Sequence, residues 1–119
     1  MIKMINKLKI LDDCRELVKK VFILCNNNID LKHTLNSQII RSSISVGSNI
    51  AEGNERVGKD RNHFFSIALG SLEECRFQLS LYLEYNGECE ELLNKIRGVV
   101  FKLKQSQSLS QSQSFSKGE

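Results

Sequence analysis

The sequence predicts an all-α fold, a single antiparallel four-helix bundle with up-down-up-down topology and a disordered C-terminal tail. The chain of 119 residues contains no proline, which permits long uninterrupted helices. Apolar residues recur at i, i+3, i+4 and i+7 in four stretches, the spacing of amphipathic helices. Only a few residues connect these stretches, so consecutive helices should lie side by side and antiparallel. We therefore predict a bundle over residues 1–104 and a tail over residues 105–119.

The first two helices are expected over residues 10–25 and from residue 30 or 31 to residue 52 or 53. The asparagines at 26–28 should end the first helix, because Asn tolerates turn conformations. Gly53 should end the second helix in the left-handed region, which a residue without Cβ enters at no steric cost. A close approach of another group to Gly53 is the alternative.

The third and fourth helices are expected over residues 60–85 and 89–104. Asn86 and Gly87 should stop the third helix. Gly70 lies in its interior, where glycine costs roughly 1 kcal/mol relative to alanine. We expect Gly70 to let a neighbouring helix pass close by and, with Ser71, to face the second helix. Residues 105–119 form a Ser/Gln tract too polar to offset the entropy of ordering.

Composition and charge restrict the class of protein. Hydrophobic residues make up 40% and charged residues 26% of the chain, as in soluble globular domains, and no apolar run is long enough for a membrane span. We expect a cytoplasmic protein without membrane contact. The four cysteines form no CxxC pair, and each lies on an apolar stripe. We expect buried, reduced thiols, with a disulfide or a metal role as the alternative, and we predict no metal and no cofactor.

The second helix carries a run of polar residues at heptad spacing, which we call the polar seam. Its members are separated by alternating steps of four and three residues and are Gln38, Ser42, Ser45, Asn49, Glu52 and Arg56. Such a seam is either a solvated face or a surface that meets another polar helix. The small serines favour close packing, because a solvated helix face usually carries long Glu, Lys and Arg side chains.

Two carboxylates, Glu52 and Glu74, could suggest acid–base catalysis. Neither has a recognisable nucleophile, metal partner or pocket in the sequence, so we expect them to form salt bridges with arginines. His33 and His63 lack metal-ligand spacing. We therefore predict no catalytic residue and no small-molecule substrate.

Positive residues surround the expected start of the third helix. These residues form a basic turn and are Arg56, Lys59, Arg61 and His63. Arg41 lies along the seam of the second helix that leads to this turn. Such a cluster could hold a phosphate backbone by charge, which makes these residues candidates for nucleic-acid binding. A solvated face is the alternative.

Three strings of this sequence resemble the 23S rRNA intervening-sequence proteins, also called four-helix bundle proteins. They are QIIRSSISV at 38–46, NIAEG at 49–53 and IALGSLEE at 67–74. The resemblance spans about residues 8 to 104, and the accessory proteins of diversity-generating retroelements are similar in fold. The positions that we expect to be structural or to form an interface are Gln38, Ser45, Asn49, Glu52, Gly53, Gly70, Ser71 and Glu74.

The resemblance implies a bundle that assembles into rings, commonly homopentamers, with a positively charged surface. In the retroelement branch, the ring binds a reverse transcriptase and nucleic acid. We therefore expect a non-enzymatic homo-oligomer that binds RNA, DNA or a nucleic-acid-handling partner such as a reverse transcriptase. A structural adaptor that binds another protein and no nucleic acid is the alternative.

Overall fold

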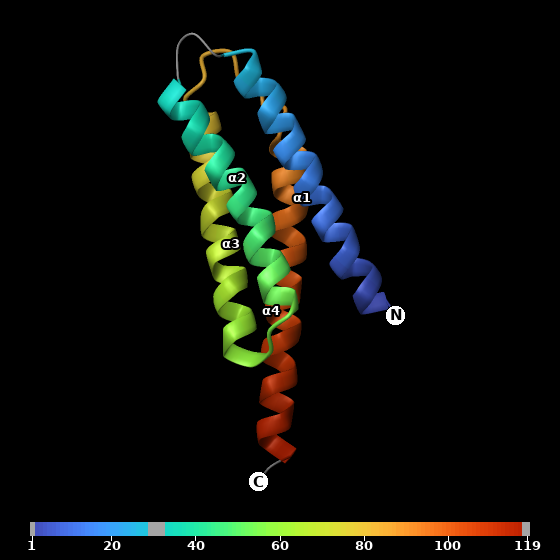
Figure 1. Cartoon of the computed structure of the whole chain (residues 1–119). Helices are drawn as coiled ribbons and strands as arrows, with labels where there is room; N and C mark the ends of the chain where they lie inside the picture. Colours follow the sequence, from blue (N-terminus) through green and yellow to red (C-terminus); the bar gives the residue numbers. More distant parts are fainter. Residues whose placement is uncertain (1, 29–32, 118–119) are drawn as a thin grey trace.

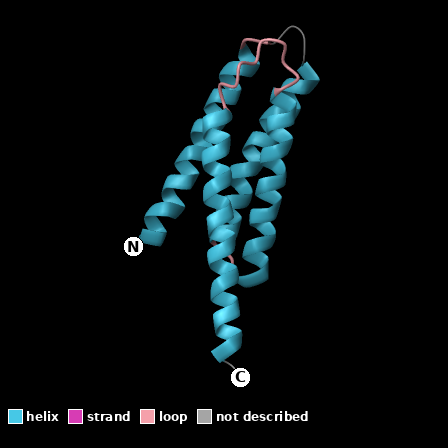
Figure 2. Ribbon diagram, turned by 180° about the vertical axis from the view of Figure 1, so that it is seen from behind, coloured by secondary structure: helices cyan, strands magenta, loops and turns pink. Residues whose placement is uncertain are grey.

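The computed structural model describes the backbone of residues 2–28 and 33–117 and the side chains of residues 7–28 and 34–104. It contains four helices, α1 (Ile2–Asn26), α2 (His33–Asn54), α3 (Gly58–Leu79) and α4 (Glu90–Lys117). No strand occurs among the described residues (Figures 1 and 2). The predicted all-α fold with four helices is confirmed.

Consecutive helices run in opposite directions. The start of α1 meets the end of α2, where Lys7 Nζ donates a hydrogen bond to the Asn54 carbonyl at 3.2 Å. The end of α1 meets the start of α2, where Asn36 Nδ2 donates to the Cys25 carbonyl at 3.1 Å. The hydrogen bonds between α2 and α3, and those between α3 and α4, likewise join later residues of one helix to earlier residues of the other (Figure 1). This arrangement is compatible with the predicted up-down-up-down topology.

The core is formed by the inward apolar stripes of all four helices. Among the described side chains, those of largest volume that are fully buried are Phe65, Ile10, Leu17, Ile39, Ile50, Leu72, Leu79, Leu93, Ile96, Val21, Val46 and Val100. These positions recur at the three- and four-residue steps that predicted each helix. The hydrophobic periodicity therefore identifies the inner face of every helix.

A buried polar cluster closes one end of the bundle. Asn36, in the first turns of α2, accepts a hydrogen bond from the Tyr82 hydroxyl, and Tyr82 belongs to the connection between α3 and α4. The same hydroxyl lies 3.4 Å from Cys25 Sγ on α1. Buried polar groups need such partners, because an unsatisfied one costs roughly 1–3 kcal/mol. The cluster ties three segments together, and the sequence pattern did not identify it.

The helix boundaries differ from the prediction in several places. α1 begins earlier, at Ile2, and the predicted start of α2 lies outside the described residues. α3 ends at Leu79 and not at residue 85. From Ser80 onward the backbone tightens into i→i−3 hydrogen bonds, and Ser80 Oγ donates to the Phe77 carbonyl. A serine hydroxyl competes for helical carbonyls in this way, which gives a physical reason for the early end.

α4 continues further than the apolar pattern predicted. We expected the helix to end at Lys104, whereas its backbone is helical to Lys117. The Ser/Gln tract contains no proline, and its glycine comes only at Gly118, so nothing in it prevents a helical backbone. In Figures 1 and 2 this part of α4 projects past the turn between α2 and α3.

Two glycine predictions were wrong. Gly53 does not end α2 in the left-handed region; it is buried inside the helix, and Gly58 has the positive φ of 61°. A Cβ at Gly53 would lie 2.6 Å from Cε1 of Phe65, so the glycine is needed for close approach. Gly70 is in close contact with no neighbouring helix, because it is exposed and a Cβ there would meet nothing within 4 Å.

The four cysteines are buried and free, as predicted. Burial raises the pKa of the Cys14 thiol to about 12 and the pKa values of Cys75 and Cys89 to about 11. Burial also raises the pKa of Cys25, although a hydrogen bond with Tyr82 opposes this shift. The thiolate is the reactive form, so these thiols should be inert in the folded protein.

We expect two consequences of these raised pKa values. Ellman's reagent at pH 8 should leave the native thiols unmodified and should titrate all four in guanidinium chloride.

The unfolded chain releases thiol protons near pH 9, whereas the folded chain retains them. The free energy of unfolding should therefore fall as pH rises from 9 towards 11, by roughly 1 kcal/mol per pH unit for each fully shifted thiol. Urea unfolding at a series of pH values measures this slope, which Cys75→Ala should reduce. Rapid reaction of the native protein with Ellman's reagent would contradict the burial of the thiols. A pH dependence of stability that is the same with and without Cys75→Ala would also contradict it.

Candidate functional site

The polar seam of α2 packs against α3 of the same chain. At its centre, Ser45 Oγ and Ser71 Oγ lie 2.8 Å apart and share a hydrogen bond. One turn away, Ser42 Oγ donates to Gln78 Oε1 at 2.7 Å. Ser42 and Ser71 are buried. The central seam is therefore an intramolecular helix contact, and its interpretation as a solvated face is wrong there.

The ends of the polar seam remain exposed. Gln38 Oε1 accepts a hydrogen bond from Arg41 Nε at 3.2 Å, and Arg56 Nε lies 3.3 Å from a carboxylate oxygen of Glu52. Between them, Asn49 Nδ2 donates to the Ser45 carbonyl at 2.9 Å. These contacts stay within α2 and the turn that follows it, and none of them reaches α3. Only the serine-rich centre of the seam joins the two helices directly.

The two carboxylates that could have suggested catalysis have arginine partners. Glu74 pairs with Arg41 at 2.7 Å across the α2–α3 contact, and Glu52 pairs with Arg56. The prediction that they form salt bridges is confirmed. In the part of the chain with described side chains, no three His, Cys, Asp or Glu residues are grouped closely enough to hold a metal ion. The arrangement orients helices and does not assemble an acid–base pair.

The fold brings separate basic segments to one end of the bundle, the lower end in Figure 1. The hydrogen bond from Lys7 to Asn54 places the beginning of α1 beside the α2–α3 turn. Lys104 Nζ donates to Ser66 Oγ at 2.8 Å, which places α4 beside the first half of α3. We call this region the basic end; its cationic residues are Lys7, Lys9, Arg56, Lys59, Arg61, Lys102 and Lys104. They outnumber the nearby carboxylates Glu52, Glu55 and Asp60.

Aromatic rings support the arginines of the α2–α3 turn. The guanidinium carbon of Arg56 lies 5.4 Å from the ring centroid of Phe64, and His63 meets the same ring edge-on. Arg61 lies over the Phe65 ring at 4.9 Å, and burial lowers the pKa of its guanidinium below the ordinary value. An arginine nevertheless stays protonated at neutral pH. The sequence did not reveal that Phe64 and Phe65 would position these two cations.

The predicted basic residues do not all gather at one place. Arg56, Lys59, Arg61 and His63 lie around the α2–α3 turn, as expected. Arg41 lies 13 residues before the end of α2 at Asn54, or about 20 Å from the turn at a rise of about 1.5 Å per residue, and it pairs with Glu74. Arg41 is therefore not part of the basic end.

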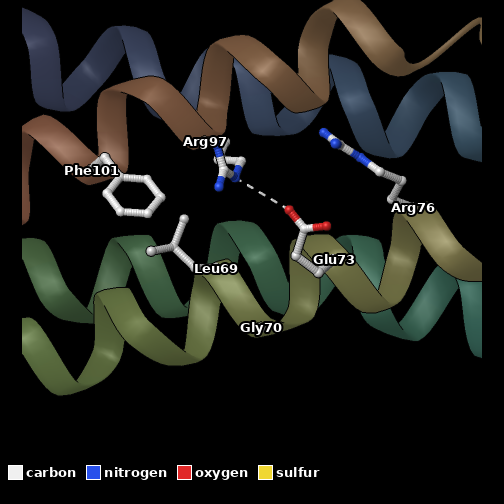
Figure 3. Close-up of a pocket in the computed structure, with 6 residues that line it drawn as sticks. All are labelled: Leu69, Gly70, Glu73, Arg76, Arg97 and Phe101. Carbon is white, nitrogen blue, oxygen red and sulfur yellow. Dashed lines mark ion pairs between the residues drawn. The ribbon is translucent and has the colours of Figure 1, made fainter.

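A groove of about 580 Å³ separates α3 from α4 (Figure 3). Leu69 and Phe101 form one part of its wall, and Glu73 pairs with Arg97 across it at 3.3 Å. The Arg97 guanidinium also lies 4.9 Å from the centroid of Phe101. Arg76, the third charged residue that lines the groove, pairs with Glu90 at 3.5 Å. Each charged group of this groove therefore has a partner on the facing helix, and these pairs hold α3 and α4 together.

Comparisons with known proteins agree with this architecture. The model of the 23S rRNA-intervening sequence protein family matches residues 6–106. The structure resembles that of a protein of unknown function from the S23 ribosomal protein family of Bacteroides thetaiotaomicron, with a TM-score of 0.58 and 20% identity over 84% of this chain and 92% of that chain. A search of curated proteins gave no match. No helix in the described ranges is long and apolar enough to cross a membrane.

Proposed function

The chain belongs to the 23S rRNA-intervening sequence protein family, and we propose that it is a non-enzymatic, ring-forming module whose basic end binds nucleic acid. The proposal rests mainly on the convergence of positive charge at the basic end. Lysines and arginines from α1, the α2–α3 turn and α4 share this end, although they are far apart in the sequence. Phosphate backbones bind such clusters by charge and counterion release.

The chemistry of the basic end favours binding without sequence preference. Arg56 and Arg61 lie on aromatic rings of their own chain, which leaves these rings poorly placed to stack on bases. Lys59 is exposed, and a lysine ammonium acts on phosphate as a point charge. We therefore propose weak, strongly salt-dependent binding to the phosphate backbone of RNA or DNA.

The family membership and the ring proposal suggest how weak contacts could serve a function. A ring, which we propose to be a homopentamer, presents several basic ends together, and linked sites bind a long polyanion more tightly than one site does. A nucleic-acid-handling protein such as a reverse transcriptase is the partner that fits this role. Gel filtration with light scattering tests the ring, and a monomer at high micromolar concentration would contradict it.

Nucleic-acid binding should depend on the basic end and not on net charge alone. We expect Lys59→Gln combined with Lys104→Gln to weaken binding of a mixed-sequence duplex by about tenfold at low salt. The slope of log affinity against log salt should become shallower by about 0.9 for each lost phosphate contact. Fluorescence anisotropy with a labelled duplex, titrated at several salt concentrations, measures both quantities.

The matched control changes net charge equally at the other end of the bundle. Ser80 and Leu83 are exposed in the α3–α4 connection, so Ser80→Glu with Leu83→Glu alters the charge by the same amount. This control should retain most of the affinity. Equal loss in both variants would show a general charge effect, and absence of binding by the wild-type protein at low salt would leave the protein adaptor as the better function.

A further inference from the structure

The solvent side of α3 and the turn that follows it carry a second row of residues at heptad spacing, and three of its six members are large apolar side chains. We call it the outer seam; it follows steps of four and three residues through His63, Ile67, Gly70, Glu74, Phe77 and Leu81. Phe77 is 65% exposed and Leu81 is 48% exposed. A Cβ at Gly70 would meet nothing within 4 Å, so the middle of the seam is open to an approaching helix. Apolar residues at this spacing are typical of a helix that packs against a partner.

The outer seam differs from the exposed face of α4. Exposed residues at the same spacing on α4 are Glu91, Lys95, Gly98 and Lys102, which suit contact with water. α3 buries an apolar stripe in the core and adds serine contacts with α2, and its solvent side also exposes Phe77. Clustered exposed apolar side chains of this kind mark interaction surfaces.

A groove on the opposite flank of the bundle has matching properties. It lies between α1 and α2, has a volume of about 470 Å³ and is lined mainly by Leu11, Val18, Ile44, Gly47 and Ala51. A Cβ at Gly47 would lie 3.1 Å from Cys14 Cβ, so the helices almost touch at the floor of the groove. The groove is therefore shallow and apolar, and suited to receive side chains from another helix.

Charges around the two surfaces are complementary. Arg15 and Lys19 lie on the α1 side of the groove. Glu73 and Glu74 lie one turn before Phe77 on α3, where they pair with Arg97 and Arg41 of the same chain and stay about half exposed. A half-exposed carboxylate can accept a further hydrogen bond, so Lys19 of another copy can join these pairs. Opposite charges around an apolar contact favour one orientation and suppress others.

We propose that the outer seam of one copy of this chain docks into the α1–α2 groove of the next copy. The inference rests on the proposed ring and names its contact surfaces. Because the two surfaces differ, the contact is heterologous, and repetition of a heterologous contact about a closing rotation generates a ring. Phe77 fills the part of the groove nearest Val18, and Gly70 lets the backbone of α3 approach Gly47.

The heights of the two surfaces along the bundle support this pairing. Ser71, next to Gly70, contacts Ser45 on α2, and two residues further along α2 Gly47 contacts Cys14 on α1. The centres of the outer seam and the groove therefore lie at nearly the same height. In a ring whose axis runs along the bundle, cyclic symmetry keeps all copies at one height, so neighbours present these centres to each other.

Blocking either surface should abolish assembly. Phe77→Glu disables the outer seam, and Ala51→Glu places a bulky charged group in the apolar groove. Both positions are exposed, so the variants should keep the helical circular dichroism spectrum of the wild-type protein and unfold cooperatively. In sedimentation velocity, each variant should be monomeric at concentrations at which the wild-type protein is fully assembled. Leu83→Glu, an equal change at a residue 96% exposed outside the seam, should assemble normally.

Mixing the two variants tests the heterologous geometry directly. Phe77→Glu retains a working groove and Ala51→Glu retains a working outer seam, so an equimolar mixture should form a 1:1 dimer and nothing larger. Variants that stay assembled, or a mixture that stays monomeric at the highest soluble concentration, would overturn the surface assignment while the ring itself stood. A monomeric wild-type protein would overturn the ring as well.

Discussion

Gly53→Ala should destabilise the fold by about 1 kcal/mol, although alanine is the better helix former. The added Cβ would lie 2.6 Å from Cε1 and 2.7 Å from Cδ1 of Phe65, which is fully buried. Overpacking of this kind costs about 1–3 kcal/mol, and it outweighs the roughly 1 kcal/mol that alanine gains in helix propensity. Urea unfolding of the two proteins measures the difference.

Gly98→Ala is the matched control for this prediction. Gly98 also lies inside a helix, but it is exposed and its Cβ would meet nothing within 4 Å. This variant should gain about 0.5–1 kcal/mol. A double-mutant cycle with Phe65→Leu should show coupling, because a smaller side chain at that position relieves the clash with the new methyl group. Equal effects of the two glycine substitutions would contradict the close contact between Gly53 and Phe65.

The surroundings of Gly53 and Gly70 could not be predicted from the sequence. The hydrophobic period identified the four helices and their inner faces, because one face of each helix must be buried. It could not decide what touches a glycine, since that depends on which neighbouring side chain reaches it. Gly53 packs against the ring of Phe65, whereas a Cβ at Gly70 would meet no atom within 4 Å. A glycine inside a helix occurs both where a neighbouring side chain packs against the backbone and where the surface is open, and the sequence does not distinguish the two.

The residues of the candidate site could be predicted from the sequence, but which of them lie together could not. The charges of the α2–α3 turn were evident from the sequence, but their association with Lys7 and Lys104 depends on the antiparallel register of α1 and α4. Arg41 seemed to belong to the same group and instead pairs with Glu74. The buried bond between Tyr82 and Asn36 joins residues with no shared motif, so only the tertiary structure reveals it.

The spacing of the two heptad seams also did not determine their roles. The serine-rich centre of the polar seam contacts α3 within the chain, and Phe77 and Leu81 of the outer seam remain exposed. Small hydroxyl side chains can fill a close helix contact when they satisfy each other's hydrogen bonds, whereas large apolar groups need more room. If the outer seam is an interface between copies, substitutions in the two seams should therefore have separable effects.

Ser45→Leu should lower the stability of the individual chain by about 3 kcal/mol. The larger side chain forces apart α2 and α3, which costs about 1–3 kcal/mol, and it leaves the buried Ser71 hydroxyl without its partner, which costs roughly 1–3 kcal/mol more. Ser37→Leu, the same change at an exposed position of α2, should have little effect. Urea unfolding at submicromolar protein should show the loss independent of concentration, because the contact lies within one chain. Phe77→Glu should instead alter assembly and leave this stability unchanged, so a concentration-dependent effect of Ser45→Leu would place the polar seam between chains.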